Sequence, residues 1–205
     1  MELSEEIIAA VSFGALVAYH LHLTWRIRTA PLTVTMGLAR RIRSLWVHTL
    51  MAGKLDILAI QTLRNWTMGA TFLASASILL GLGAFNLALS AGQNGDLSTL
   101  PHSYWMVKLG ALGIDFFASF FCFTISVRYF NHVGMMINVL DTEGEAGFPP
   151  EAVQSILERG AVSYSVGMRL LYLTIPLVMW MFGPWWLAGS SAGLLMALVW
   201  LDRGL

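Results

Sequence analysis

The chain has 205 residues, of which 57% are hydrophobic and only 12% are charged. Typical soluble domains carry roughly 25% charged residues, and a chain this short must expose most of its surface, so the composition argues strongly against a soluble enzyme. The single cysteine excludes a disulfide scaffold, and the net charge of zero argues against nucleic-acid binding. We therefore expect an all-α polytopic transmembrane helix bundle, organised as one integral membrane domain over residues 1–205.

Five stretches are apolar enough to cross a bilayer, which requires about 20 residues per helix. They are residues 7–24, 66–89, 104–127, 161–182 and 185–201. The start of the chain is acidic and lacks the positive charge of a secretory signal, so we expect the first stretch to be a retained helix. A charge-free run over residues 170–201 connects the last two stretches, and within it Gly183 and Pro184 predict a turn. A single proline-kinked helix, giving four spans, is the alternative.

The basic residues predict an orientation. With five spans, eleven of the twelve lysines and arginines fall on one side of the membrane, and only Lys108 falls on the other. The positive-inside rule then predicts an outside N-terminus and a cytoplasmic C-terminus, in a bacterial inner membrane. Four spans would move Arg203 to the outside, so the charge pattern favours five. Tryptophans at both predicted membrane interfaces agree with this arrangement: Trp25, Trp66 and Trp200 inside, and Trp105, Trp185 and Trp186 outside.

A basic amphipathic helix is predicted over residues 36–53. Its apolar side carries Leu38, Ile42, Leu45, Trp46 and Thr49. Such a helix is typical of the membrane interface, and three of its residues are candidates for binding anionic lipid headgroups, namely Arg40, Arg41 and Arg43. The alternative is that these positive charges only fix the topology. The other cytoplasmic loop is acidic and balances them, with Asp141, Glu143, Glu145, Glu151 and Glu158.

A second polar group lies where the chain enters the second span. Gln61, Arg64 and Asn65 are three and four residues apart, so they share one side of a helix. They either tie this helix to a neighbouring helix or form the entrance of a ligand site.

Three of the ionisable residues within the predicted spans are of particular interest because they lie at comparable depth: His20, Asp115 and Arg169. Such groups are costly in a membrane unless they are paired. We expect Asp115 to pair with Arg169 or with His20, as a structural ion pair or as part of a proton or substrate relay. The side of the helix that carries Asp115 continues with weakly polar residues, which are Ser119, Cys122 and Ser126.

No catalytic, cofactor or metal-binding motif is predicted. The histidines do not share a depth and a helix face, so a bis-histidine haem site is not expected, and no zinc or copper site has better support. Gly189 and Gly193 form a GxxxG motif in the last span, which favours close helix packing.

The chain resembles a family of small multi-span membrane proteins, the domain of unknown function numbered five-nine-nine. Three segments carry the resemblance: residues 61–68, residues 130–132 and residues 180–185. The resemblance extends from about residue 10 to the end of the chain. The resemblance implies a multi-span membrane protein and no established activity. If these segments meet, a cytoplasm-facing polar cluster results, formed by Gln61, Arg64, Asn65, Asn131 and His132.

Three functions fit these features. The first is an accessory or structural subunit of a larger membrane complex, since the chain is small, lacks a catalytic motif and has close-packing faces. The second is a small-solute or proton transporter that uses the Asp115 side of the third span. The third is a lipid- or quinone-binding protein that acts at the cytoplasmic polar cluster. The expected partners are membrane lipids and another membrane protein or a second copy, but not nucleic acid.

Overall fold

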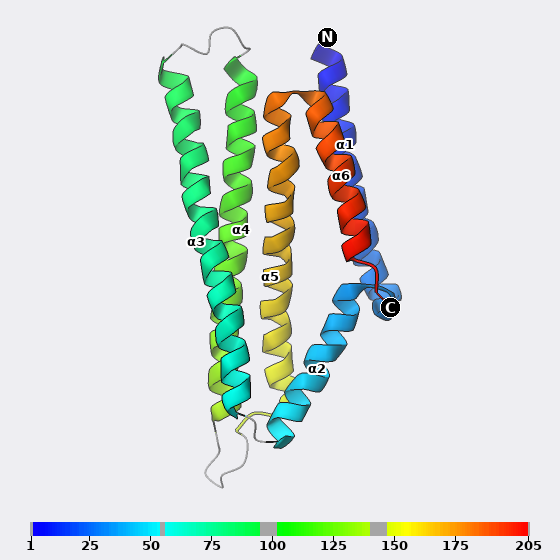
Figure 1. The fold of residues 1–205 in the computed structure, drawn as a ribbon, viewed down its shortest axis with the longest axis vertical. Helices are drawn as coiled ribbons and strands as arrows, with labels where there is room; N and C mark the ends of the chain where they lie inside the picture. Colours follow the sequence, from blue (N-terminus) through cyan, green and yellow to red (C-terminus); the bar gives the residue numbers. More distant parts are fainter. Residues whose placement is uncertain (1, 54–55, 95–101, 140–146, 205) are drawn as a thin grey trace. The chain divides into compact units, whose positions relative to one another are not determined.

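The computed structural model describes residues 2–53, 56–94, 102–139 and 147–204. These residues form six α-helices and two short 3₁₀ helices, η1 (Pro31–Thr33) and η2 (Trp180–Phe182). The α-helices are α1 (Glu2–Thr29), α2 (Thr35–Gly53), α3 (Asp56–Asn94), α4 (His102–Asn138), α5 (Pro150–Met179) and α6 (Pro184–Leu201). The described residues form no sheet, only an isolated bridge between Val34 and Arg203, so the predicted all-α class is confirmed (Figure 1).

Five helical segments are long and apolar enough to cross a membrane, which identifies an integral membrane protein and confirms the prediction of five spans. They are Glu5–Thr29, Ile57–Ser90, Trp105–Asn138, Pro150–Phe182 and Pro184–Leu201. The last two are separate helices because Gly183 has a φ of 132°, which glycine adopts at little cost. Pro184 then begins α6 at the position where a missing N–H matters least.

Helix α3 is longer than one membrane crossing. Its 39 residues correspond to roughly 58 Å at 1.5 Å per residue, whereas the hydrocarbon core of a bilayer is about 30 Å thick. Helix α4, with 37 residues, is similarly long. Both helices therefore have segments that extend beyond the predicted spans.

The chain divides into two compact units. The first unit comprises residues 1–38, 78–117 and 170–205, and the second comprises residues 39–77 and 118–169. Helices α3, α4 and α5 each contribute a segment to both units.

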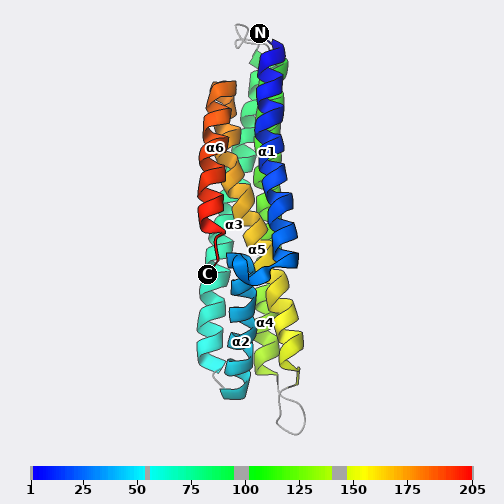
Figure 2. The same ribbon diagram turned by 90° about the vertical axis from the view of Figure 1, so that its right-hand side faces the viewer.

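In the first unit, α1 lies beside α6 (Figures 1 and 2). Polar contacts join the end of α6 to α1 and to the start of α2: Tyr19 of α1 donates a 2.6 Å hydrogen bond to Asp202, and Thr35 of α2 donates to the carbonyl oxygens of Leu201 and Arg203. A separate apolar core contains Ala84, Leu112, Phe116 and Leu177. The C-terminal end of α6 is thus held by side chains far away in the sequence.

The second unit has a core of its own, built by α2 and by segments of α3, α4 and α5. Its nine buried residues are Val47, Leu50, Ala59, Leu63, Phe130, Val133, Ile137, Val153 and Leu157. All nine lie outside the five spans predicted from the sequence. The segments between those spans therefore pack as a helical core, as the burial of apolar surface requires.

Within the second unit, α5 packs against α4 through two glycines. A Cβ atom at Gly160 would lie 2.9 Å from Cε1 of Phe130, and a Cβ atom at Gly167 would lie 3.0 Å from Cε1 of Phe123. The two glycines are seven residues apart, as are the two phenylalanines. The Phe130 ring therefore packs into the space beside Gly160, and the Phe123 ring packs into the space beside Gly167; we call each of these spaces a notch. We call these four residues the glycine seam.

Candidate binding groove between helices α3 and α4

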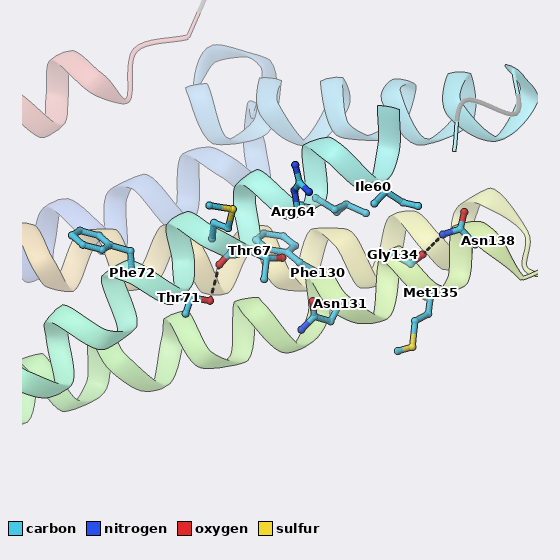
Figure 3. Close-up of a pocket in the computed structure, with 12 residues that line it drawn as sticks. Ile60, Arg64, Thr67, Thr71, Phe72, Phe130, Asn131, Gly134, Met135 and Asn138 are labelled. Carbon is cyan, nitrogen blue, oxygen red and sulfur yellow. Dashed lines mark hydrogen bonds between the residues drawn. The ribbon is translucent and has the colours of Figure 1, made fainter. Parts of the chain in front are cut away.

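The second unit contains a groove between α3 and α4, with a volume of about 650 Å³. This volume falls within the range of about 300–1,000 Å³ typical of small-molecule sites. The wall on α3 consists of Ile60, Leu63, Arg64, Thr67, Met68, Thr71 and Phe72, and the wall on α4 consists of Phe130, Asn131, Gly134, Met135 and Asn138 (Figure 3). Leu63 and Phe130 are buried and form the apolar floor, whereas Met68, Phe72 and Met135 are exposed along the rim.

The polar side chains of the groove differ in whether they have hydrogen-bond partners. Thr71 donates to the carbonyl oxygen of Thr67, and Asn138 donates to that of Gly134, so both serve their own helices (Figure 3). Within the described part of the chain, Arg64 and Asn131 have no hydrogen-bond or ion-pair partner. In Figure 3 the Arg64 side chain leaves α3 on the side away from Asn131. The groove therefore offers unused donors at two separate points.

The groove crosses the predicted edge of the second span, which begins at residue 66. Arg64 lies just before this edge, whereas Met68 and Phe72 lie beyond it. Arg64 and Phe72 are eight residues apart, which corresponds to roughly 12 Å along a helix. Arg64 thus lies at the interface predicted from the sequence but within the longer candidate span Ile57–Ser90, and apolar side chains continue along the groove toward Phe72.

A second groove, of about 480 Å³, is lined by residues of α2, α3, α4 and α5 in the same unit. Asn65 and Trp66 line it, and Phe130 is shared with the first groove. The Trp66 ring lies between Trp46 and Phe130, with centroid distances of 5.7 and 5.6 Å. These ring contacts hold Phe130 and Trp66 in place where the two grooves adjoin.

The predicted cytoplasmic polar cluster is divided between these surfaces. Arg64 and Asn131 line the first groove, and Asn65 lines the second. Gln61 and His132 are exposed and line neither. Thr67 and Asn138 also line the first groove but are not among the predicted site residues. Their spacing could have indicated them, because Thr67 lies three residues after Arg64 and Asn138 lies seven after Asn131, which keeps each pair on one side of a helix.

The basic residues of α2 have different environments. Arg40 and Arg41 are exposed. Arg43 instead forms a two-pronged salt bridge with Glu158 of α5, in which Nε and Nη2 each lie within 3.0 Å of Oε2, and both side chains are only 20% exposed. Ser44 donates a 2.9 Å hydrogen bond to Gln154. One side of α2 is therefore fixed to α5. Of the acidic residues predicted to balance the arginines of α2, Glu158 pairs with Arg43, whereas Asp141, Glu143 and Glu145 lie outside the described residues.

Asp115 is buried, with 6% of its surface exposed. Its Oδ2 atom has no hydrogen-bond partner among the described residues of the first unit. His20 uses Nδ1 for a 2.8 Å contact with the carbonyl oxygen of Leu16. Asp115 and Arg169 belong to different units, and their predicted pairing stays a prediction.

The weakly polar residues that follow Asp115 lie in the second unit, where two of them contact or approach α5. Ser119 donates a 3.1 Å hydrogen bond to the carbonyl oxygen of Gly167 and accepts one from Ser77. Cys122 lies beside the Gly167 notch, and the hydroxyl of Ser126 is buried without a partner in the described part of the chain. These contacts give Ser119 a role in joining helices.

Gly189 and Gly193 on α6 are exposed, and no described atom would lie within 4 Å of a Cβ atom at either position. Among the described residues, no three histidine, cysteine or acidic side chains are grouped so that they could hold a metal ion.

A comparison with known protein families identifies the family of this chain. The family described as "Protein of unknown function, DUF599" matches residues 7–204. The chain belongs to this family. No curated protein matches the chain, and no solved structure matches it. The resemblance noted in the sequence is thus confirmed over nearly the whole chain, and the geometry of the groove is the basis for considering function.

Proposed function

We propose that this protein binds a membrane amphiphile, a lipid or an isoprenoid quinone, in the groove between α3 and α4. The observation that carries the proposal is the groove itself, which combines an apolar floor and rim with Arg64 and Asn131, two residues that have no partner among the described residues. Ligand sites are mostly apolar, with a few polar groups that orient the ligand. An amphiphile has the same distribution, a polar head joined to an apolar tail.

We further propose a bacterial inner membrane as the location, with the N-terminus outside and the C-terminus in the cytoplasm. The support is the charge distribution: with five spans, eleven of the twelve lysines and arginines share one side. In this orientation Arg64 lies near the cytoplasmic interface. Labelling of single cysteines introduced at the two ends of the chain, in a Cys122→Ala background, tests this orientation. Labelling of the C-terminal cysteine from outside intact cells would contradict it.

Filling the groove tests the proposed function. Gly134 lines the groove, and a Cβ atom there would lie 3.8 Å from Leu63, an ordinary contact, so Gly134→Leu should place its side chain in the groove without disturbing the helices. The matched control is Gly14→Leu, because Gly14 is exposed and has no neighbour within 4 Å among the described residues.

The measurement is mass spectrometry of the lipids and quinones that remain bound after purification in mild detergent. We expect the wild type and Gly14→Leu to retain a similar molar amount of amphiphile, and Gly134→Leu to retain several-fold less at equal folded yield. Equal retention by Gly134→Leu, or no retained amphiphile in the wild type, would refute the proposal.

A subunit of a larger membrane complex is the second candidate. It is favoured by the exposed Gly189 and Gly193 side of α6, which has no neighbour within 4 Å in the described part of the chain. Small residues in membrane helices allow a second helix to approach closely. Native mass spectrometry of the wild type and of Gly193→Leu tests this candidate. A partner or second copy should be lost in the variant, and a wild type that runs alone as a monomer contradicts it.

A further inference from the structure

We infer that the occupant of the α3–α4 groove is an anionic phospholipid, with its phosphate at Arg64. This inference rests on the proposed function and narrows it, since that function requires only an amphiphile. Arg64 is the cation among the residues that line this groove.

The charge state of Arg64 is the first argument. Arg43, on α2 of the same unit, has a carboxylate partner in Glu158. Arg64 lines a groove and has no partner among the described residues. An arginine keeps its positive charge under all ordinary conditions, and its planar guanidinium matches a phosphate group in geometry. A phosphate bound here would supply the counter-charge that the described chain does not provide.

A neutral head group fits the site less well. A quinone carbonyl can accept a hydrogen bond from Arg64 but brings no charge. A neutral ligand that covered Arg64 would remove water from an unpaired cation, which costs several kcal/mol unless an opposite charge compensates. Charge complementarity therefore favours the phospholipid over the quinone.

The positions of the donors give the second argument. Arg64 and Asn131 lie on different walls of the groove, and in Figure 3 the Arg64 side chain points away from Asn131. A phospholipid presents acceptors at separate points, first its phosphate oxygens and then the ester carbonyls of its chains. Asn131 has an amide that can donate to such a carbonyl. Beyond them, Met68 and Phe72 provide an exposed apolar path into the predicted span.

The composition of membranes gives the third argument. In the proposed orientation Arg64 lies near the cytoplasmic interface, where anionic lipids attract basic residues at about 1 kcal/mol each. The rim residues Met68, Phe72 and Met135 are exposed, so a lipid in the same leaflet can reach the groove without leaving the membrane. The inferred ligand is thus one that the surrounding leaflet supplies.

Competition between two lipids tests the inference. The purified wild-type protein is delipidated and then equilibrated in detergent with equal amounts of phosphatidylglycerol and phosphatidylcholine, which differ in net charge. Bound lipids are counted by native mass spectrometry. We compare Arg64→Gln and Arg64→Lys with Arg159→Gln, a matched control, because Arg159 is an exposed arginine of the same unit that lines neither groove.

We expect the wild type and Arg159→Gln to prefer phosphatidylglycerol about fivefold, and Arg64→Gln to lose that preference. Arg64→Lys should retain part of it, because a lysine keeps the charge but not the planar donors. If the wild type binds both lipids equally, or if Arg64→Gln keeps the preference, the inference is wrong although the groove still binds an amphiphile. If neither lipid and no quinone binds, the inference and the proposed function fail together.

Arg40 and Arg41 on α2 are the other exposed cations considered for lipid binding. A double variant, Arg40→Gln with Arg41→Gln, separates the two sites. The inference requires this variant to keep the preference for phosphatidylglycerol. If the preference is lost there, the lipid belongs to α2 and the assignment to Arg64 is overturned.

Discussion

The glycine seam makes a quantitative prediction about stability. At Gly160, the first atoms that an added methyl group would meet are Cε1 and Cδ1 of Phe130, at 2.9 and 3.0 Å, and Cβ of Tyr129, at 3.1 Å. The Phe130 ring is buried, and its centroid lies 5.6 Å from that of Trp66, so it has little room to move. The Cβ atom of Tyr129 moves only with its backbone. In Gly160→Ala, α5 and α4 must therefore separate by a few tenths of an ångström.

Two opposing effects set the magnitude. Overpacking a core by one methyl group costs about 1–3 kcal/mol. Replacing a helical glycine by alanine returns up to about 1 kcal/mol through helix propensity. Gly14→Ala on α1 is the matched control, since it has the same propensity gain and meets no described atom within 4 Å. The two variants should thus differ by about 1–3 kcal/mol, with Gly160→Ala the less stable.

Thermal unfolding in detergent, followed by tryptophan fluorescence, measures this difference. For a chain of this length, each kcal/mol shifts Tm by roughly 2–4 °C, so the two variants should be separated by about 2–12 °C. Gly167→Ala should behave like Gly160→Ala, because its methyl group would lie 3.0 Å from the Phe123 ring. If Gly160→Ala melts at or above the temperature of Gly14→Ala, the close approach of α4 and α5 is not a tight contact and the reasoning is refuted.

Three further substitutions remove single polar contacts, and each is measured as the change in Tm. Glu158→Gln breaks the half-buried salt bridge with Arg43. It should lower the free energy of unfolding by about 1–2 kcal/mol, between the values for exposed and buried pairs. A double-mutant cycle with Arg43→Met should then show coupling, and independent effects of the two substitutions would contradict this prediction. Tyr19→Phe loses the 2.6 Å hydrogen bond to Asp202 and should cost about 1 kcal/mol, whereas an unchanged Tm would show that this contact does not hold α6. Lys108→Met keeps the apolar stem but loses the 3.0 Å bond to the carbonyl oxygen of Trp180 and the contact with its ring, so about 1–2 kcal/mol should be lost; a Tm equal to wild type would refute this.

The spans and the turn at Gly183 could be predicted from the sequence because each depends on local chemistry. A long charge-free run of apolar residues is stable as a helix across the membrane, and a Gly-Pro pair interrupts a helix wherever it occurs. The face of α2 that packs against the protein could not be predicted in this way. Ile42 and Leu45, on the predicted apolar side, are 56% and 60% exposed, whereas Val47 and Leu50 are buried. Near a membrane, the most apolar side of a helix can face lipid as readily as protein, so hydrophobicity does not identify the packed side.

The polar cluster was predicted only in part for a geometric reason. Arg64 and Asn65 are neighbours in the sequence, but successive residues on a helix with 3.6 residues per turn point about 100° apart. The aromatic wall of Trp66 and Phe130 falls between them, so one lines the first groove and the other lines the second. Placing that wall requires the register between α3 and α4, which depends on contacts between distant parts of the chain.

The same register connects the groove to the glycine seam. Phe130 lines the groove, and its ring also packs against Gly160. Phe123 fills the Gly167 notch but does not line the groove. A displaced Phe130 ring changes the shape of the groove, whereas a displaced Phe123 ring does not. Gly160→Ala should therefore lower both stability and lipid retention, while Gly167→Ala lowers stability alone. Equal lipid retention by the two variants, measured by mass spectrometry at equal folded yield, would show that the groove does not depend on the packing beneath it.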